Sequence, residues 1–137
     1  MLERKFAKLI DDALCSVGAL TFNIHGHRFQ KSGWPDLYCA HPKWTGFCEL
    51  KVDKNKPSPV QVTVMKDLVR RGVPAFVVRF RENVVYCEFW FKTDEFETLA
   101  YCHEWQRFKG TARGMNLLTM FNEAGDRAIE MITKGSR

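Results

Sequence analysis

The chain has 137 residues, of which 45% are hydrophobic and 27% are charged, and its formal net charge is +5. These values fit one compact domain and exclude general disorder or two full-sized domains. No apolar run approaches the ~20 residues needed to cross a bilayer, and residues 1–6 lack the apolar stretch of a signal peptide. We therefore expect an intracellular, cytoplasmic protein, whose basic charge permits nucleic acid as a partner without requiring it.

Five cysteines are scattered along the chain without a CxxC pair. Zinc sites normally show paired Cys or His spacing, so a structural zinc site is not expected. An odd number of scattered cysteines in apolar segments is typical of reduced, buried thiols in an intracellular protein.

The first half of the chain predicts a helix followed by three strands. Apolar residues recur at helical spacing over residues 2–14. Alternating apolar and polar residues predict a strand over residues 19–29, and further strands are expected over residues 34–40 and 47–52. The connection over residues 41–46 is short enough to make a hairpin of the last two.

The second half begins with a clear helix start. Ser58 can cap the helix, Pro59 fits its first position and Gln61 completes a capping box, and the helix should end near residue 71. The remaining expected elements are strands over residues 75–80 and 84–89, and helices over residues 94–108 and 116–134. This order, αβββαββ followed by C-terminal helices, predicts an α/β fold with a mixed sheet of about five strands flanked by helices.

Three charged residues fall on the two strands of the predicted hairpin. Glu49 and Lys51 share one face of their strand because side chains alternate, and pairing of the strands would bring Asp36 beside Glu49. Two carboxylates and a backbone carbonyl, here that of Leu50, suit a Mg²⁺ ion that keeps several waters. Lys51 could then orient or deprotonate a water, or neutralise charge on a phosphate. An ordinary ion pair on a solvated sheet face is the alternative that the spacing alone leaves open.

Three blocks in this order resemble the PD-(D/E)XK nuclease superfamily. Within it, the chain is similar to the stand-alone phage and bacterial type of the VRR-NUC family, which shows G-x-P-D-L, then E-x-K, then S-x-x-Q. The matching blocks here are Gly33-Trp34-Pro35-Asp36-Leu37, Glu49-Leu50-Lys51 and Ser58-Pro59-Val60-Gln61. The resemblance covers roughly residues 2–80 and implies a restriction-endonuclease-like core over residues 1–81. Residues 82–137 are expected to add a strand and helices to the same compact domain or to a dimer interface.

The resemblance also implies roles for the matching positions. Asp36 and Glu49 would be metal ligands, Lys51 the catalytic lysine, and Gln61 a helix residue directed at the site. Family members often carry a further acid on the first helix. Glu3 is the candidate here, since it lies at the edge of the apolar helix face, although helix-dipole stabilisation would also explain a glutamate in the first turn.

A DNA-cleaving site needs cations that hold the phosphate backbone. Lys54 and Lys56 follow the E-x-K strand directly, and Arg28 and Lys31 precede the P-D motif, so we expect these four to contact DNA. Further basic residues near the next helix–strand junction could contribute: Arg70, Arg71, Arg79 and Arg81. Trp34 and Trp44 could stack on bases, although packed aromatic side chains are more common.

Taken together, the residues and the resemblance predict a Mg²⁺-dependent endodeoxyribonuclease, with Mn²⁺ able to replace Mg²⁺. The resemblance implies a homodimer that cuts branched DNA, including Holliday junctions, since paired incisions need two sites related by a twofold axis. An exonuclease or a restriction-type enzyme of the same fold, or a non-catalytic DNA-binding protein, are the alternatives.

Overall fold

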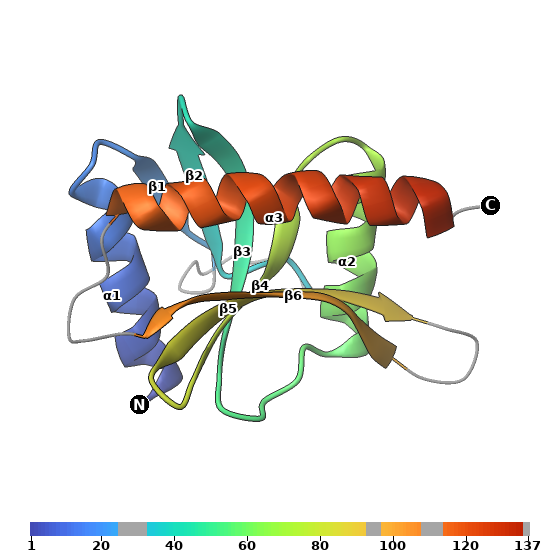
Figure 1. The fold of residues 1–137 in the computed structure, drawn as a ribbon, viewed down its shortest axis with the longest axis horizontal. Coiled ribbons are helices and arrows are strands. Elements are labelled where there is room, and N and C mark those ends of the chain that lie inside the picture. The colour runs from blue at the N-terminus through green and yellow to red at the C-terminus, as the bar shows by residue number, and fades with distance from the viewer. Residues whose placement is uncertain (25–32, 93–96, 108–113, 136–137) are drawn as a thin grey trace.

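The structure is a computed structural model. It describes the backbone of residues 1–24, 33–92, 97–107 and 114–135, and the side chains of residues 1–24, 33–89 and 114–126. The elements in chain order are α1 (Glu3–Cys15), β1 (Leu20–Asn23), β2 (Leu37–His41), β3 (Trp44–Val52), α2 (Pro59–Arg70), β4 (Ala75–Arg81), β5 (Val84–Lys92), β6 (Glu97–Arg107) and α3 (Gly114–Gly135). α3 crosses the molecule, with α1 near one end of it and α2 toward the other (Figure 1). No helix in the described ranges is long and apolar enough to span a membrane.

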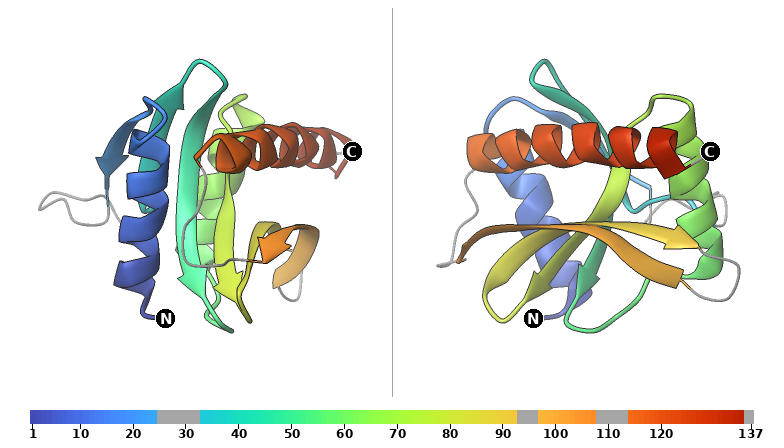
Figure 2. Two further views of the ribbon diagram at one scale, coloured as in Figure 1. Left: turned by 60° about the vertical axis from the view of Figure 1, so that its left-hand side comes forward. Right: turned by 45° about the vertical axis from the view of Figure 1, so that its right-hand side comes forward.

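The strands form one mixed sheet in the order β1-β2-β3-β4-β5-β6. Every neighbouring pair is antiparallel except β3 and β4, which run parallel because α2 connects them by a crossover. The sheet is strongly twisted, and its two ends are seen at different angles in Figure 2. The predicted class, a mixed sheet flanked by helices, is confirmed.

The last third of the chain differs from the prediction. Residues 94–108 were expected to form a helix, but Glu97–Arg107 is the sixth strand, paired antiparallel with β5. Apolar residues in this segment happen to recur at helical spacing, whereas the pairing with β5 depends on tertiary context that local spacing does not encode. The sheet therefore has six strands rather than about five, and the one C-terminal helix in the described ranges is α3.

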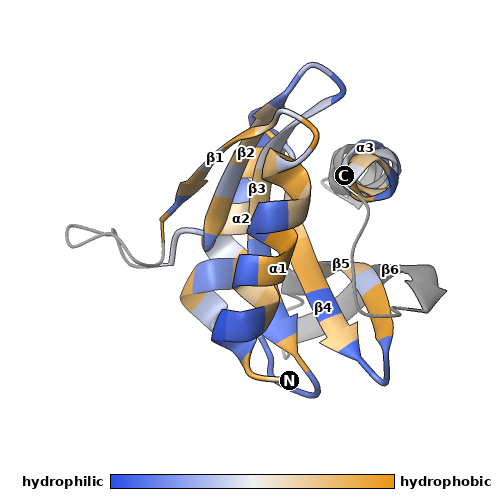
Figure 3. Cartoon of the chain, turned by 90° about the vertical axis from the view of Figure 1, so that its left-hand side faces the viewer, coloured by the Kyte–Doolittle hydropathy of each residue, from blue (hydrophilic) through white to orange (hydrophobic). Residues whose placement is uncertain are grey.

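Both faces of the sheet centre are covered by helices. Phe6 of α1 contacts Phe80, with ring centroids 5.7 Å apart, and Phe121 of α3 contacts Phe76 at 5.5 Å. Phe76 and Phe80 lie on the same face of β4, so α1 and α3 share that face. The strand β4 is apolar for most of its length, and α1 turns polar residues to the outside (Figure 3).

The second face of β4 is covered by α2. Every residue from 75 to 80 is buried, and α2 packs on β4 and β5 through Val62, Met65 and Val69. Its predicted start is confirmed: the Ser58 hydroxyl accepts from the Gln61 N–H, and the Gln61 side chain accepts from the Ser58 N–H. The crossover therefore delivers the N-terminus of α2 to the end of β3 that carries Glu49 and Lys51.

None of the cysteines whose side chains the structure describes forms a disulfide. Cys39, Cys48 and Cys87 are buried, whereas Cys15 is exposed. Burial raises the pKa of the Cys48 thiol well above its usual value and that of Cys39 to about 11. These thiols are therefore packing residues that stay protonated at neutral pH.

Candidate active site

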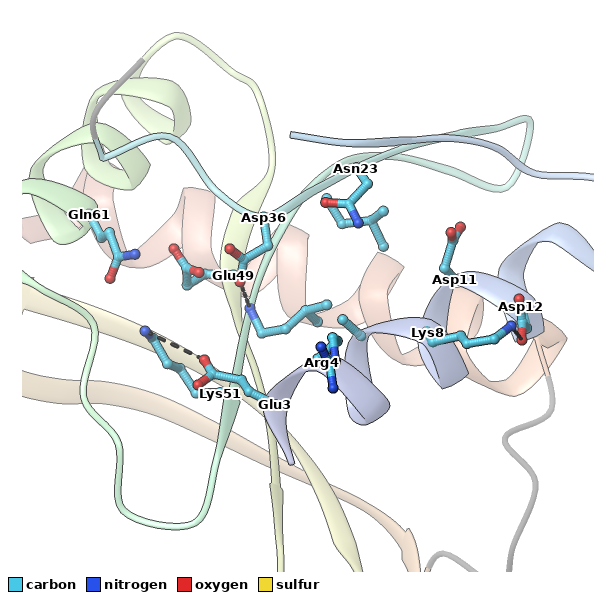
Figure 4. A pocket seen from close by; sticks show the side chains of 13 residues that line it. Glu3, Arg4, Lys8, Asp11, Asp12, Asn23, Asp36, Glu49, Lys51 and Gln61 are labelled. Carbon is cyan, nitrogen blue, oxygen red and sulfur yellow. Dashed lines mark hydrogen bonds and ion pairs between the residues drawn. The ribbon is translucent and has the colours of Figure 1, made fainter. Parts of the chain in front are cut away.

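The hairpin of β2 and β3 brings Asp36 and Glu49 together. Its last register pair is Leu37 with Cys48, so Asp36 lies one position further, opposite Glu49 and on the same face. Tyr38 and Phe47 form the next pair on this face, with ring centroids 5.1 Å apart. The predicted juxtaposition of the two carboxylates thus follows from the strand register (Figure 4).

A tight turn aims the Asp36 carboxyl group. Gly33 adopts a φ of +85°, and a Cβ at this position would collide with Val60 of α2. The buried Pro35 then leads into Asp36, whose Oδ2 accepts a hydrogen bond from the Leu50 N–H at 2.8 Å. The P-D and E-x-K segments are therefore locked together through the backbone of Leu50.

Glu49 is a buried acid without a matching donor. The residue is 1% exposed, and neither carboxylate oxygen has a hydrogen-bond partner among the described residues. Burial, followed by the adjacent Asp36 carboxyl, raises the pKa of Glu49 to about 10, although the Lys51 ammonium opposes the shift. Unless a proton or a cation lies between the two carboxyl groups, this arrangement is costly.

These residues fit a hard divalent cation. The backbone N–H groups of Phe47 and Asp53 donate hydrogen bonds toward β4. The backbone N–H and C=O groups of odd-numbered β3 residues therefore point toward β4, and those of Leu50 point toward the β2 side. The Leu50 carbonyl therefore lies on the side of β3 where β2 ends and Asp36 begins. In the described ranges, no site has three His, Cys, Asp or Glu side chains as metal ligands, so a cation here would have only two side-chain ligands. Two carboxylates and one carbonyl match Mg²⁺, which keeps several waters.

Lys51 lies two residues after Glu49 on the same strand face, and its side chain is 14% exposed. Its Nζ is 3.7 Å from Oε1 of Glu3, at the start of α1 (Figure 4). The structure therefore pairs Glu3 with the lysine and does not gather it with Asp36 and Glu49 into a three-carboxylate cluster. The expected metal-ligand role of Glu3 stays a prediction.

Gln61 takes part in both arrangements that the sequence suggested. Its Oε1 accepts a hydrogen bond from the Ser58 N–H at 2.8 Å, and its side chain also lines the cavity beside Glu49. As the third residue of α2, it places the positive end of that helix dipole at the same cavity.

A cavity of about 550 Å³ connects these groups. It runs from Gln61 past Asp36 and Glu49 and along one side of α1. Sequence reasoning missed five of its polar lining residues, which are Arg4, Lys8, Asp11, Asp12 and Asn23. Arg4 shares a helix face with Lys8 at i, i+4 spacing, a signal that was available; Asn23 depends on the pairing of β1 with β2.

The predicted DNA-contacting residues fall into three groups. Lys54 and Lys56 are exposed on the loop between β3 and α2, close to Lys51 in the chain. Arg28 and Lys31 lie outside the described residues. The sequence suggested Arg79 as a further basic residue that could contact DNA, but it is buried in an ion pair with Glu88.

The two tryptophans beside the motifs differ in exposure. Trp44 is 4% exposed and packs on Phe76 and Phe121, as expected of a core aromatic residue. Trp34 is half-buried and contacts the edge of Phe47, with centroids 5.7 Å apart. Of the two, Trp34 is therefore the one that a bound molecule could touch.

The element order and the sheet define a restriction-endonuclease-like fold. Among solved structures, the chain is similar to Hjc, a Holliday junction resolvase from the archaeal hyperthermophile Archaeoglobus fulgidus. The likeness has a TM-score of 0.50 and 18% sequence identity, and covers 71% of this chain and 85% of that chain. No protein-family model and no curated protein matches the sequence. The VRR-NUC assignment stays a prediction, and at this identity the likeness establishes the fold alone.

Proposed function

We propose that this chain is a divalent-metal-dependent endodeoxyribonuclease that acts on branched DNA, with the Holliday junction as its substrate. The observation that carries the proposal is the buried carboxylate of Glu49, which lies beside Asp36 and has no hydrogen-bond partner among the described residues. A bound cation would relieve the repulsion between the two carboxylates, and Lys51 on the same strand face would complete the charge pattern of phosphodiester hydrolysis. The similar solved structure is itself a Holliday junction resolvase, which supports this choice of substrate.

In this proposal Asp36, Glu49 and the Leu50 carbonyl would hold Mg²⁺, or Mn²⁺ in its place. When bound, the ion supplies positive charge to the scissile phosphate and lowers the pKa of the attacking water. The Leu50 N–H fixes the Asp36 carboxyl group at 2.8 Å. Because Glu49 is buried, water has little access to its carboxylate, and this strengthens the electrostatic attraction between the carboxylate and a bound cation.

Lys51 contributes a second positive charge at the phosphate. Its ammonium group is held by Glu3 at 3.7 Å and can stabilise the negative charge that develops on the phosphate oxygens during attack. The N-terminus of α2 faces the same cavity through Gln61 and favours an anion there. Lys54 and Lys56 would hold the flanking phosphates.

A cleavage assay on a panel of labelled substrates tests the proposal. Four-way junctions, flaps, nicked duplexes and linear duplexes are incubated with Mg²⁺, Mn²⁺ or EDTA. We expect paired incisions in the junction with either metal and none in EDTA. Lys51→Ala should abolish cleavage, whereas Lys43→Ala, at the exposed turn between β2 and β3, should cleave like the wild type.

The rival functions give different results on the same panel. Digestion from DNA ends would identify an exonuclease, and cutting at one sequence in linear duplexes would identify a restriction-type enzyme. Metal binding without cleavage of any substrate would favour a non-catalytic DNA-binding protein.

We also propose that the chain acts as a homodimer, because paired incisions across a junction need two sites related by a twofold axis. Light scattering at micromolar concentration should therefore report twice the monomer mass for the free protein, and the mass of two protomers plus one junction for the complex. A monomer under both conditions would contradict the dimer and leave the nuclease assignment open to the cleavage assay.

A further inference from the structure

A buried ion pair joins β4 and β5 on the sheet face that carries Glu49 and Lys51. Arg79 of β4 is 6% exposed and Glu88 of β5 is 7% exposed. The Arg79 Nε donates to both carboxylate oxygens of Glu88, at 2.9 and 2.8 Å. Buried ion pairs of this kind often contribute less to stability than apolar residues of the same volume would. Their presence calls for a reason other than packing.

The other end of the Arg79 guanidinium supplies that reason. Its Nη1 donates to the backbone carbonyl of Asp53 at 2.8 Å and to that of Asn55 at 2.6 Å. Asp53 has a φ of +52°, so the chain turns sharply there. Lysine could not make these contacts together, since only the planar guanidinium fork presents donors to a carboxylate and two carbonyls at fixed angles. Glu88 and Arg79 thus clamp the backbone of the loop over residues 53–57.

This loop joins β3, the strand that carries Glu49 and Lys51, to α2. Arg79 is the register partner of Lys51, so the clamp lies next to the proposed catalytic lysine. The Asn55 N–H donates to the Val52 carbonyl at 3.2 Å, and Pro57 is buried. The side chains of Lys54 and Lys56 are exposed on either side of Asn55. The loop therefore presents two cations from a backbone that is anchored at Asp53, Asn55 and Pro57.

We propose that Arg79, held by Glu88, is a positioning residue that fixes this loop so that Lys54 and Lys56 contact DNA phosphates flanking the Asp36–Glu49 centre. The inference rests on the proposed function, since it takes DNA as the ligand. It assigns Arg79 a role through the loop and no contact with the substrate. It predicts that loss of the clamp weakens DNA binding through the two lysines and leaves the carboxylate pair intact.

Hydrogen exchange tests the clamp without any DNA. The variants are Arg79→Met combined with Glu88→Met, which removes both charges, and Arg79→Lys, which keeps the charge but loses the fork. In both, the amides of Asp53 and Asn55 should exchange at least about tenfold faster. The Phe47 amide, which donates to Pro74 at the other end of β3, should be unchanged. Unchanged protection of Asp53 and Asn55 in Arg79→Lys would overturn the clamp even if the double variant does not fold.

DNA binding in EDTA tests the role of the clamp independently of cleavage. Removing both lysines (Lys54→Ala with Lys56→Ala) should weaken junction binding by about tenfold and reduce the salt slope by about two, one for each lost phosphate contact. Arg79→Lys should weaken binding by a similar factor, and adding the two alanine substitutions to it should have less than about a twofold further effect. Additive effects would show that Arg79 does not act through the lysines and would overturn the inference.

The two proposals fail in different ways. If the wild-type protein binds no junction or duplex DNA, the proposed function is wrong, and the role of the clamp in DNA binding falls with it. If the wild type binds and cleaves junctions and Arg79→Lys binds them equally well, only the positioning role of Arg79 is wrong.

Discussion

The Asp36 carboxyl group accepts a hydrogen bond from the backbone N–H of Leu50, 2.8 Å away, in the middle of Glu49-Leu50-Lys51. The carboxylate of Asp36 is therefore oriented by the backbone of the segment that carries Glu49. An asparagine could accept the same hydrogen bond through its side-chain oxygen, which makes charge removable without loss of this contact. This separates the structural part of Asp36 from its part in binding a cation.

Asp36→Asn should abolish metal binding while preserving the fold. We expect a loss of at least about 100-fold in cleavage rate, since one of two ligand charges is removed. Calorimetric titration with Mg²⁺ should show no binding, and the circular dichroism spectrum should match that of the wild type. Asp67→Asn, which breaks an exposed ion pair with Arg70 on α2, is the matched control and should bind Mg²⁺ normally. Equal Mg²⁺ affinity in the two variants would contradict the assigned site.

Glu49→Gln should change how the stability of the metal-free protein depends on pH. The folded-state pKa of Glu49 is raised to about 10 by burial and by Asp36, while the unfolded value is near that of an ordinary carboxyl group. Between these values the folded state holds the proton more tightly, so this group lowers stability as the pH rises, by at most about 1.4 kcal/mol per pH unit. Urea denaturation in EDTA at pH 5, 7 and 9 should therefore show Glu49→Gln gaining on the wild type toward pH 9. Parallel pH profiles would contradict the buried, proton-holding state of Glu49.

Glu3→Gln decides between the two roles of this residue. If Glu3 only holds Lys51, as the 3.7 Å contact indicates, Mg²⁺ affinity should be unchanged and the cleavage rate should fall by less than about tenfold. A metal-ligand role instead predicts a loss of roughly 10–100-fold in Mg²⁺ affinity. Calorimetry on Glu3→Gln and the wild type distinguishes the two results.

Gly33→Ala should disturb both stability and the site. Alanine is strained at a φ of +85°, and its Cβ would collide with Val60, so we expect a loss of about 1–3 kcal/mol in unfolding free energy. Gly18 has a similar φ of +88° but open space around it, so Gly18→Ala reports the backbone strain alone. Urea denaturation of both variants isolates the collision, and only Gly33→Ala should also reduce cleavage. Equal losses of stability would show that Val60 yields without cost.

Local patterns predicted the elements that position the carboxylates. The connection expected over residues 41–46 is a turn of two residues, Pro42 and Lys43, which fixes the register of β2 against β3. Alternation then places Glu49 and Lys51 on one face. The capping box of Ser58 and Gln61 is likewise a contact between residues close in the chain. Each of these features is determined by interactions within about fifteen residues.

Features that depend on strand order were beyond local patterns. The burial of Arg79 requires β5 to lie beside β4 with Glu88 in reach, and the pairing of Glu3 with Lys51 requires α1 to begin near β3. The strand β6 is formed by pairing with β5 over its length, which overrides the helical spacing of its apolar residues. None of these partners could be identified from the spacing of residues along one segment.

The strand β3 is hydrogen-bonded to β4 on one side and to β2 and Asp36 on the other, so it lies inside the sheet. Segments held in this way open only with a free energy close to that of complete unfolding. Glu49 and Lys51 thus form a rigid template that cannot adapt to its ligand. Under the proposed function, selection among DNA shapes would then depend on the energy of deforming the nucleic acid to fit that template, and flexible junctions would be easier to accommodate than stiff linear duplexes.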